Sequence, residues 1–151
     1  MQVNRLTSNL IYMKSGDAAS SVCVVIPVYK AQNEILEVLN QIPDLVSKII
    51  VVDDACPNGT GKLVQEKSKD KRVEVIFNNE NLGVGGAMVV GYRKALEQEH
   101  EILVKLDGDG QMDPTRIPKL IGPIIRGQAD YAKGNRFDSL EDLEQMPRIR
   151  I

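Results

Sequence analysis

Histidine and cysteine are scarce in this sequence, and their scarcity excludes several kinds of active site. The single histidine, His100, leaves almost no material for a histidine metal site or a Ser-His-Asp triad. The two cysteines, Cys23 in an apolar run and Cys56 in a turn, have neither metal-ligand spacing nor a disulfide pattern. Cys23 is expected to be a small buried hydrophobe. Any chemistry must come from carboxylates, amides, basic side chains and the backbone.

Excess charge of one sign and long apolar runs are also lacking. The 19 basic and 21 acidic residues give a net charge of -2, without the broad cationic surface that nucleic-acid binding requires. We therefore expect no nucleic-acid partner. The longest apolar stretch, Val22 to Val28, is far shorter than the roughly 20 residues that span a bilayer, and no signal-peptide pattern opens the chain. A cytoplasmic location is expected.

The hydrophobic pattern predicts one α/β domain. At 151 residues and 42% hydrophobic, the chain is long enough for a single core. We expect a poorly ordered arm over residues 1–21, followed by the domain from residue 22 to 151. Strands are predicted at 22–28, 47–53, 72–77, 101–106 and 129–133, and helices at 32–41, 60–69, 84–98 and 114–126. Because the strands are almost wholly apolar, they belong in a mainly parallel, doubly wound sheet with helices on both faces.

Polar residues follow the predicted strands, and a doubly wound sheet binds ligands beyond the carboxyl ends of its strands. The tract from Val104 to Pro114 is the most informative of these segments. Asp107 and Asp109 are expected to lie on one side of an extended backbone, with Gly108 allowing a ligand phosphate to approach and Gln111 continuing the alternation. Oxygen-only ligands favour Mg²⁺ or Mn²⁺, which complete their shells with water and substrate phosphates.

An ordinary surface turn is the alternative for this tract, because aspartate, glycine and proline are common in turns. Asp113-Pro114 is typical of a helix N-cap followed by proline at the first helical position.

Three further loops add signals at the same edge. Of the adjacent acids Asp53 and Asp54, at most one is expected to face a ligand, and Asp54 is the better candidate for contacting a nucleobase or ribose. The alternative is that one acid orders the turn and the other is solvated. The glycines of segment 81–87 fit either ligand contact at a helix N-terminus or tight packing of that helix on the sheet. Arg136, after the last predicted strand, suits a diphosphate.

Together these segments resemble the family 2 glycosyltransferases with the GT-A fold, and within that family the dolichyl- or polyprenyl-phosphate sugar synthases. The segments that carry the resemblance lie in the family's order between residues 22 and 138: Val24 to Tyr29, Val51 to Asp54 with Asn58 to Thr60, Asn81 to Ala87, Asp107 to Pro114 and Gly134 to Phe137. Two positions depart from the family's pattern. Lys30 stands where the family often has asparagine, and Cys56 where it often has serine.

The resemblance implies a role for each matched residue. It implies that Pro27 and Tyr29 line a nucleobase pocket and that Asp54 hydrogen-bonds the base. It further implies that Asp107 contacts the ribose or the metal and that Gly108 lies against the nucleotide. Asp109 with Gln111 would complete a Mn²⁺ or Mg²⁺ site of the Asp-X-Asp kind, and Arg136 would meet the diphosphate.

The implied reaction is an inverting, metal-dependent transfer of a sugar from a UDP- or GDP-linked donor. The acceptor would be a hydroxyl, for example of a glycan, or a lipid phosphate such as a polyprenyl phosphate. The reaction would belong to the synthesis of cell-envelope glycans or glycolipids. The family supplies its general base well downstream of the metal tract, so we expect this chain to hold only the donor-binding half. Exposed apolar surface at the missing interface would favour self-association. A longer protein is expected at the cytoplasmic face of a membrane.

Two other functions remain open. The chain could be a non-catalytic module that binds nucleotide sugars. A nucleotidyltransferase is the third possibility, although the segment from Pro27 to Gln32 is not the glycine-rich, basic loop that would hold a triphosphate.

Overall fold

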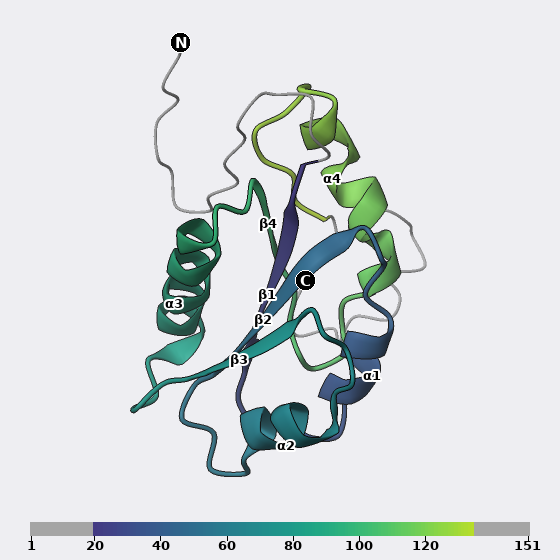
Figure 1. The fold of residues 1–151 in the computed structure, drawn as a ribbon. Coiled ribbons are helices and arrows are strands. Elements are labelled where there is room, and N and C mark those ends of the chain that lie inside the picture. The colour runs from purple at the N-terminus through teal and green to yellow at the C-terminus, as the bar shows by residue number, and fades with distance from the viewer. Residues whose placement is uncertain (1–19, 135–151) are drawn as a thin grey trace, which may run out of the picture.

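A computed structural model of the chain describes residues 20–134 and shows one parallel sheet with helices on both faces (Figure 1). The strands are β1 (Val22–Val28), β2 (Val46–Asp53), β3 (Val73–Phe77) and β4 (Ile102–Lys105). The helices are α1 (Ile35–Asn40), α2 (Thr60–Lys67), α3 (Gly83–Glu97) and α4 (Ile117–Ile125), and the short 3₁₀ helix η1 (Pro114–Arg116) precedes α4. The strand order is β3-β2-β1-β4, and each pair is parallel.

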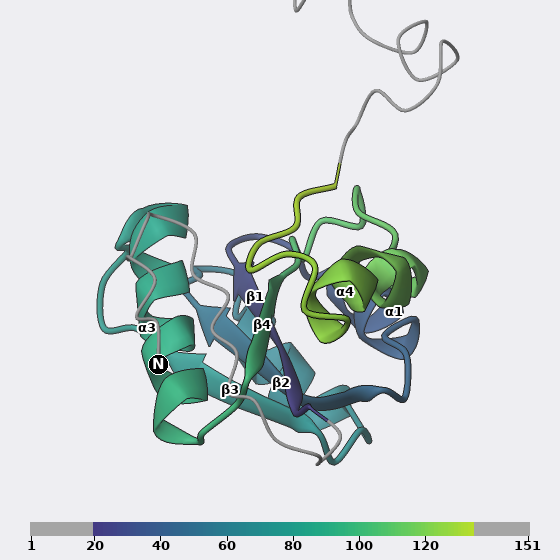
Figure 2. The same ribbon diagram turned by 90° about the horizontal axis from the view of Figure 1, so that it is seen from above.

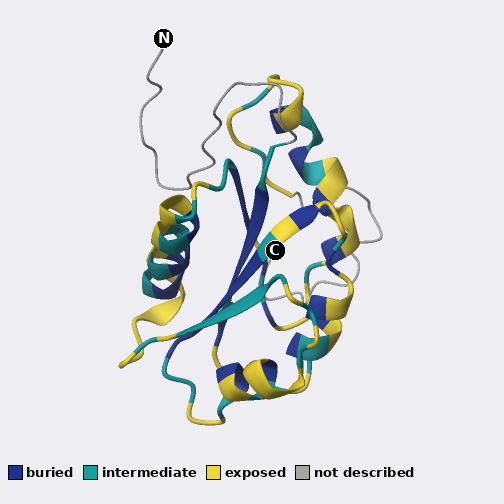
Figure 3. Cartoon of the chain, viewed as in Figure 1, coloured by how far each residue is buried: buried dark blue, intermediate teal, exposed yellow. Residues whose placement is uncertain are grey.

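Each face of the sheet packs against its own helices, which is why the strands are apolar on both sides. Alternate residues of β1 point to opposite faces, so Val24 and Ile26 pack with α1, α2 and α4, whereas Cys23 and Val25 pack with α3. Figure 2 shows α3 alone on one side of the sheet and α1 and α4 on the other. The central strands are dark blue in Figure 3 because their residues are buried beneath the helices on both faces of the sheet.

The winding of the chain reverses at β1. From β1 the chain passes through α1 to β2 and through α2 to β3, moving outward along the sheet. It then crosses the opposite face as α3 and returns to the far side of β1 as β4. The connections after β1 and β4 therefore separate at the carboxyl edge, and this kind of switch point is where open α/β sheets bind ligands.

Most of the predicted elements are confirmed, within a few residues at their ends. The expected helix 114–126 is divided into η1 and α4. The predicted strand at 129–133 is wrong: this segment is irregular. Gly127, with φ of 65°, ends the turn after α4, and the segment that follows pairs with no described strand. Residues 1–19 of the expected arm lie outside the described part of the chain.

Within residues 20–134, no helix has both the length and the apolar character needed to cross a membrane.

Candidate functional site

Asp53 organises the loop after β2. Its side chain is 3% exposed; Oδ1 accepts a hydrogen bond from the Cys56 backbone N–H at 2.7 Å, and Oδ2 accepts one from the Gly61 N–H at 2.6 Å. The carboxylate thus spans the turn and satisfies a free N–H in the first turn of α2. The alternative in which one of the adjacent acids orders the turn holds for Asp53.

Asp54 points to a different set of donors and is not solvated. It is 4% exposed, and Oδ1 accepts hydrogen bonds from Asn78 Nδ2 at 2.8 Å and from the Leu82 N–H at 2.9 Å. Asp54 therefore fixes the loop between β3 and α3 against the end of β2. Oδ2 accepts no hydrogen bond from any residue between 20 and 134, so one oxygen remains for a ligand.

Cys56 joins the loop after β2 to the loop after β1. Its Sγ accepts the Lys30 N–H at 3.1 Å and lies 3.1 Å from Thr60 Oγ1. Lys30 and Ala55 both have left-handed φ angles, 58° and 52°, a conformation that costs an ordinary L-residue roughly 1–2 kcal/mol. The bonds around Cys56 hold these conformations in place. The two departures from the family pattern, at positions 30 and 56, are thus hydrogen-bonded partners.

The two cysteines differ in their acidity. Burial raises the pKa of the Cys56 thiol, but hydrogen bonds from the Thr60 hydroxyl and from nearby backbone N–H groups outweigh burial and leave that pKa below its ordinary value. Burial raises the pKa of Cys23 to about 12. Cys23 is fully buried, as its place in an apolar strand predicts.

Tyr29 lies at the carboxyl end of β1, where the implied nucleobase pocket would be. Its side chain is 47% exposed, and Lys30 Nζ lies 5.2 Å from the centre of its ring. Pro27, two residues earlier, is half-buried. The ladder between β1 and β4 ends at Val25, so Pro27 lies where β1 no longer pairs with β4.

The Asp107 tract turns sharply. β4 ends at Lys105, whose Nζ lies 2.8 Å from Asp107 Oδ1. The expected extended run from Asp107 to Gln111 is wrong, because residues 108 and 109 form a turn and Gly110 has a φ of 75°. Asp109 Oδ1 accepts the Gln111 N–H at 3.0 Å and closes this turn.

Gly108 is a point of close approach, but the neighbours are protein side chains. A Cβ at this position would lie 3.0 Å from Val28 Cγ1 and 3.3 Å from Ile35 Cδ1. The residue is buried against β1 and α1. Farther along, Asp113 accepts the Thr115 N–H at 3.0 Å and caps η1, with Pro114 at the first helical position. That prediction is confirmed.

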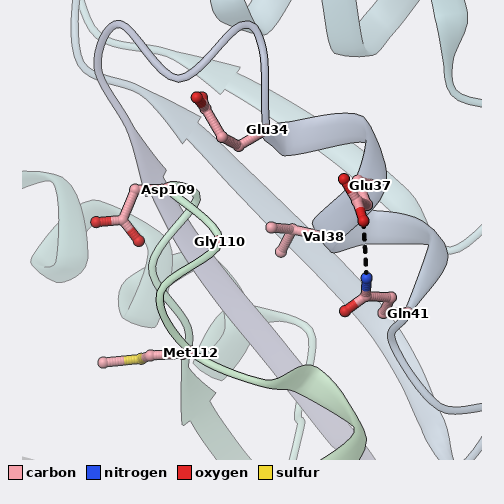
Figure 4. A pocket seen from close by; sticks show the side chains of 7 residues that line it. All are labelled: Glu34, Glu37, Val38, Gln41, Asp109, Gly110 and Met112. Atoms are coloured by element: carbon pink, nitrogen blue, oxygen red, sulfur yellow. Dashed lines mark hydrogen bonds between the residues drawn. The ribbon is translucent and has the colours of Figure 1, made fainter. Parts of the chain in front are cut away.

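A shallow cavity of about 240 Å³ opens beside this tract. Asp109, Gly110 and Met112 form one wall, and Glu34, Glu37, Val38 and Gln41 form the other. Figure 4 shows the Asp109 carboxylate pointing away from α1. The cavity is poor in cationic groups, which makes it an unsuitable place for a diphosphate. The switch point between β1 and β4 has a cation that this cavity lacks, because Lys105 lies at the end of β4.

The proposed metal ligands form an incomplete set on their own. Among residues 20–134, no three acidic, histidine or cysteine side chains are grouped to hold a metal ion. The candidate set has two carboxylates and one amide, all hard oxygen donors of the kind that Mg²⁺ and Mn²⁺ accept. Asp107 and Asp109 each use one oxygen in a described interaction and retain the other. This chemistry fits a cation whose shell is completed by ligand phosphates and water. Arg136 lies outside the described residues.

The glycines at the start of α3 are not explained by packing on the sheet. A Cβ at Gly83 or Gly85 would meet nothing within 4 Å. Tight contact occurs later in the helix, at Gly91, where a Cβ would lie 2.2 Å from Val25 Cγ1. The first turn of α3 is therefore open at Gly83 and Gly85, whereas a Cβ at Gly86 would lie 2.5 Å from Leu82 Cβ. Gly83 also has a left-handed φ of 72°, which favours glycine there.

Three residues at this edge were not identified as important from the sequence: Lys105, Cys56 and Asn78. Cys56 and Asn78 act through partners that the fold brings close, Lys30 and Asp54, whereas Lys105 pairs with Asp107 two residues along the chain. Of the three, Lys105 left a local signal, since it is the one charged residue of the otherwise apolar strand β4.

Comparisons with a family model and with curated proteins place this chain among the same kind of enzymes, the glycosyltransferases. Residues 23–151 match the model of Glycosyl transferase family 2. The chain is 31% identical over 140 residues to a UDP-N-acetylglucosamine–dolichyl-phosphate N-acetylglucosaminyltransferase of Methanococcus voltae, an alignment covering 83% of this chain and 56% of that protein. It is 34% identical over 118 residues to an undecaprenyl-phosphate mannosyltransferase of Micrococcus luteus, covering 76% and 48%. The chain thus spans about half the length of these curated relatives.

A solved structure supports the fold. The chain superposes on a crystal structure of S. aureus TarS in complex with UDP with a TM-score of 0.57 and 22% identity, covering 70% of this chain and 32% of that one.

Proposed function

Because the chain belongs to Glycosyl transferase family 2, we propose that it binds the nucleoside diphosphate sugar from which a sugar is transferred. The observation that carries the proposal is the reversal of winding at β1. It directs the loops after β1 and β4 apart and leaves Tyr29, Asp54 and Asp107 around one switch point. Ligands of open α/β sheets bind at this position.

The nucleoside is proposed to bind at the β1 and β2 side. Pro27 and Tyr29 would line the base, and the free Oδ2 of Asp54 would accept a hydrogen bond from a base N–H. The other Asp54 oxygen is held by two donors, which fixes the orientation of the carboxylate before a ligand arrives. Preorganisation of this kind lowers the entropy lost on binding.

The diphosphate is proposed to bind at the β4 side. Asp107 would lie next to the nucleotide, and Gly108, whose Cα packs against Val28 and Ile35, would approach it through the backbone alone. Asp107, Asp109 and Gln111 would hold Mn²⁺ or Mg²⁺. Such a cation would offset the negative charge that develops on the departing diphosphate. Arg136, with its planar fork of donors, is proposed to contact the same group.

The proposed acceptor is a polyprenyl phosphate. This proposal rests on the two relatives, whose names specify dolichyl phosphate and undecaprenyl phosphate. Attack from the face opposite the diphosphate would invert the anomeric centre. A phosphate monoester has a second pKa of about 6, so its attacking oxygen is already mostly ionised at neutral pH. With this acceptor the reaction places little demand on a general base.

Nucleotide binding by the Asp109→Ala variant tests the proposal. Calorimetric titration of the 151-residue chain with UDP and with GDP, with and without Mn²⁺, should show tighter binding of one nucleotide when Mn²⁺ is present. Asp109→Ala should weaken the Mn²⁺-dependent binding by at least about tenfold, or about 1.4 kcal/mol. Asp44→Ala, which removes an exposed acid before β2, is the matched control.

Each outcome has a clear meaning. If neither nucleotide binds to the wild-type chain, the proposed function is wrong. If Asp109→Ala binds as the control does, the loop is an ordinary turn and the metal site lies elsewhere.

A further inference from the structure

Lys105 is the last residue of β4, and its ammonium group is paired with the first aspartate of the proposed metal tract. The Nζ atom lies 2.8 Å from Asp107 Oδ1, with the two side chains 39% and 27% exposed. The three preceding residues of β4 are buried and apolar. A lysine is thus placed at the point where the buried strand reaches the candidate site.

The backbone of Lys105 is fixed at the switch point. Lys105 is opposite Val25 in the last register pair between β1 and β4, and the next N–H, of Leu106, donates to the Val25 carbonyl oxygen at 3.1 Å. Strand alternation puts the Lys105 side chain on the same side as Leu103, which belongs to the α3 layer. Only the flexible stem of the lysine is free to move, so its ammonium group has a limited range around Asp107.

The surrounding loops are strongly acidic. Segments 29–34, 53–59, 78–82 and 105–113 contain seven acidic residues and two basic ones, Lys30 and Lys105. Lys30 lies over the Tyr29 ring, on the β1 side. A diphosphate at the β4 side would therefore meet mainly carboxylates, and Lys105 is the described cation placed to offset them.

We propose that Lys105 is a donor-binding residue whose ammonium group contacts the diphosphate and supplies part of the charge that a divalent cation supplies at Asp107. The inference rests on the proposed function and adds a residue to its site. The same ammonium group opposes a divalent cation at Asp107 and attracts a diphosphate. The chain should consequently keep appreciable nucleotide affinity without metal, and Mn²⁺ should increase that affinity less than it would in the absence of this lysine.

The test compares Lys105→Met with Lys69→Met by calorimetric titration with UDP and GDP, in EDTA and in Mn²⁺. Lys69 is exposed in the loop before β3, at the opposite end of the sheet, so the control removes the same charge from the chain. One ion contact at a partly exposed site corresponds to roughly a fivefold to tenfold change in affinity. Lys105→Met should lose about that much affinity in EDTA relative to the control and clearly less in Mn²⁺. Lys105→Arg keeps the charge and should bind within about twofold of wild type in EDTA on the same basis.

Several results would overturn the inference. It fails if Lys105→Met binds as Lys69→Met does in EDTA, or if it loses equal affinity in both conditions, since that pattern indicates a loss of structure. Should Lys105→Met not fold, a weakening in Lys105→Arg equal to the loss of the whole ion contact would count against it, and retained binding would support it. A wild-type chain that binds neither nucleotide would overturn the proposed function and this inference together. Binding by wild type with no difference between the two methionine variants would overturn the inference alone.

Discussion

Replacing Gly91 by alanine should destabilise the protein, because α3 rests on the sheet at this glycine. A Cβ at position 91 would lie 2.2 Å from Val25 Cγ1 and 3.1 Å from Val52 Cγ2. Ordinary carbon contacts are about 3.5 Å or longer. The helix would have to move outward by roughly 1 Å, or Val25 would have to leave its rotamer. Val25 is fully buried in the central strand β1, so neither adjustment is easy.

The expected loss follows from two opposing effects. Overpacking a well-packed layer costs about 1–3 kcal/mol, and the short contact here favours the upper part of that range. Alanine is the better helix former by about 1 kcal/mol. Gly91→Ala should therefore lower the free energy of unfolding by about 1–2 kcal/mol.

Gly85→Ala in the same helix is the matched control. Gly85 is exposed, and a Cβ there would meet nothing within 4 Å, so this variant should be neutral or slightly stabilising. Urea unfolding followed by circular dichroism measures both variants against wild type. If Gly91→Ala is as stable as Gly85→Ala, α3 does not rest on the sheet at Gly91.

Two further predictions concern ionisable groups. In the native chain, iodoacetamide should label Cys56 already near neutral pH, because the lowered pKa of this thiol increases its thiolate fraction. The buried Cys23, whose pKa is raised, should stay unmodified. Mass spectrometry across a pH series measures the labelling, and equal labelling of both thiols would contradict the prediction. Hydrogen bonds from Lys48 at 2.8 Å and Gln98 at 2.9 Å lower the pKa of Glu74. The ionised carboxylate should therefore contribute about 1 kcal/mol to stability at a pH above the ordinary glutamate pKa of about 4.3. This contribution should be lost as the pH falls through the lower pKa of the folded state. Glu74→Gln should be less stable than the control Glu66→Gln at pH 7, and a difference that persists unchanged at pH 3 would refute the assignment.

The fold was predictable because its signals are local. Runs such as Ile49 to Val52 are apolar at every position, and a strand with that pattern must be covered on both faces. Helices between such strands then force a parallel sheet. The exception was segment 129–133, where a short run with some strand character carries no information about whether a neighbouring strand is available to pair with it.

The candidate site was predictable in its position and not in its details. The carboxyl ends of the strands bring the loops to one edge in any doubly wound sheet, so Asp54 and Asp107 could be placed there from sequence. The bond from the Lys30 N–H to Cys56 could not, because it joins residues 26 positions apart and depends on a left-handed φ at a lysine. Local propensities disfavour that conformation for L-residues. Only the packed structure shows what sustains it.

The adjacent acids Asp53 and Asp54 explain why a pattern of site residues alone does not identify a ligand contact. Both are almost fully buried, and burial of an ionised carboxylate is costly unless donors replace the lost water. Asp53 has donors on both oxygens, so a ligand there would have to displace the N–H of Cys56 or Gly61. Asp54 has two donors on one oxygen and none on the other within the described chain. The distribution of hydrogen bonds, rather than the acidic pair itself, therefore makes Asp54 the better candidate for the nucleobase and Asp53 a residue that holds the site in shape.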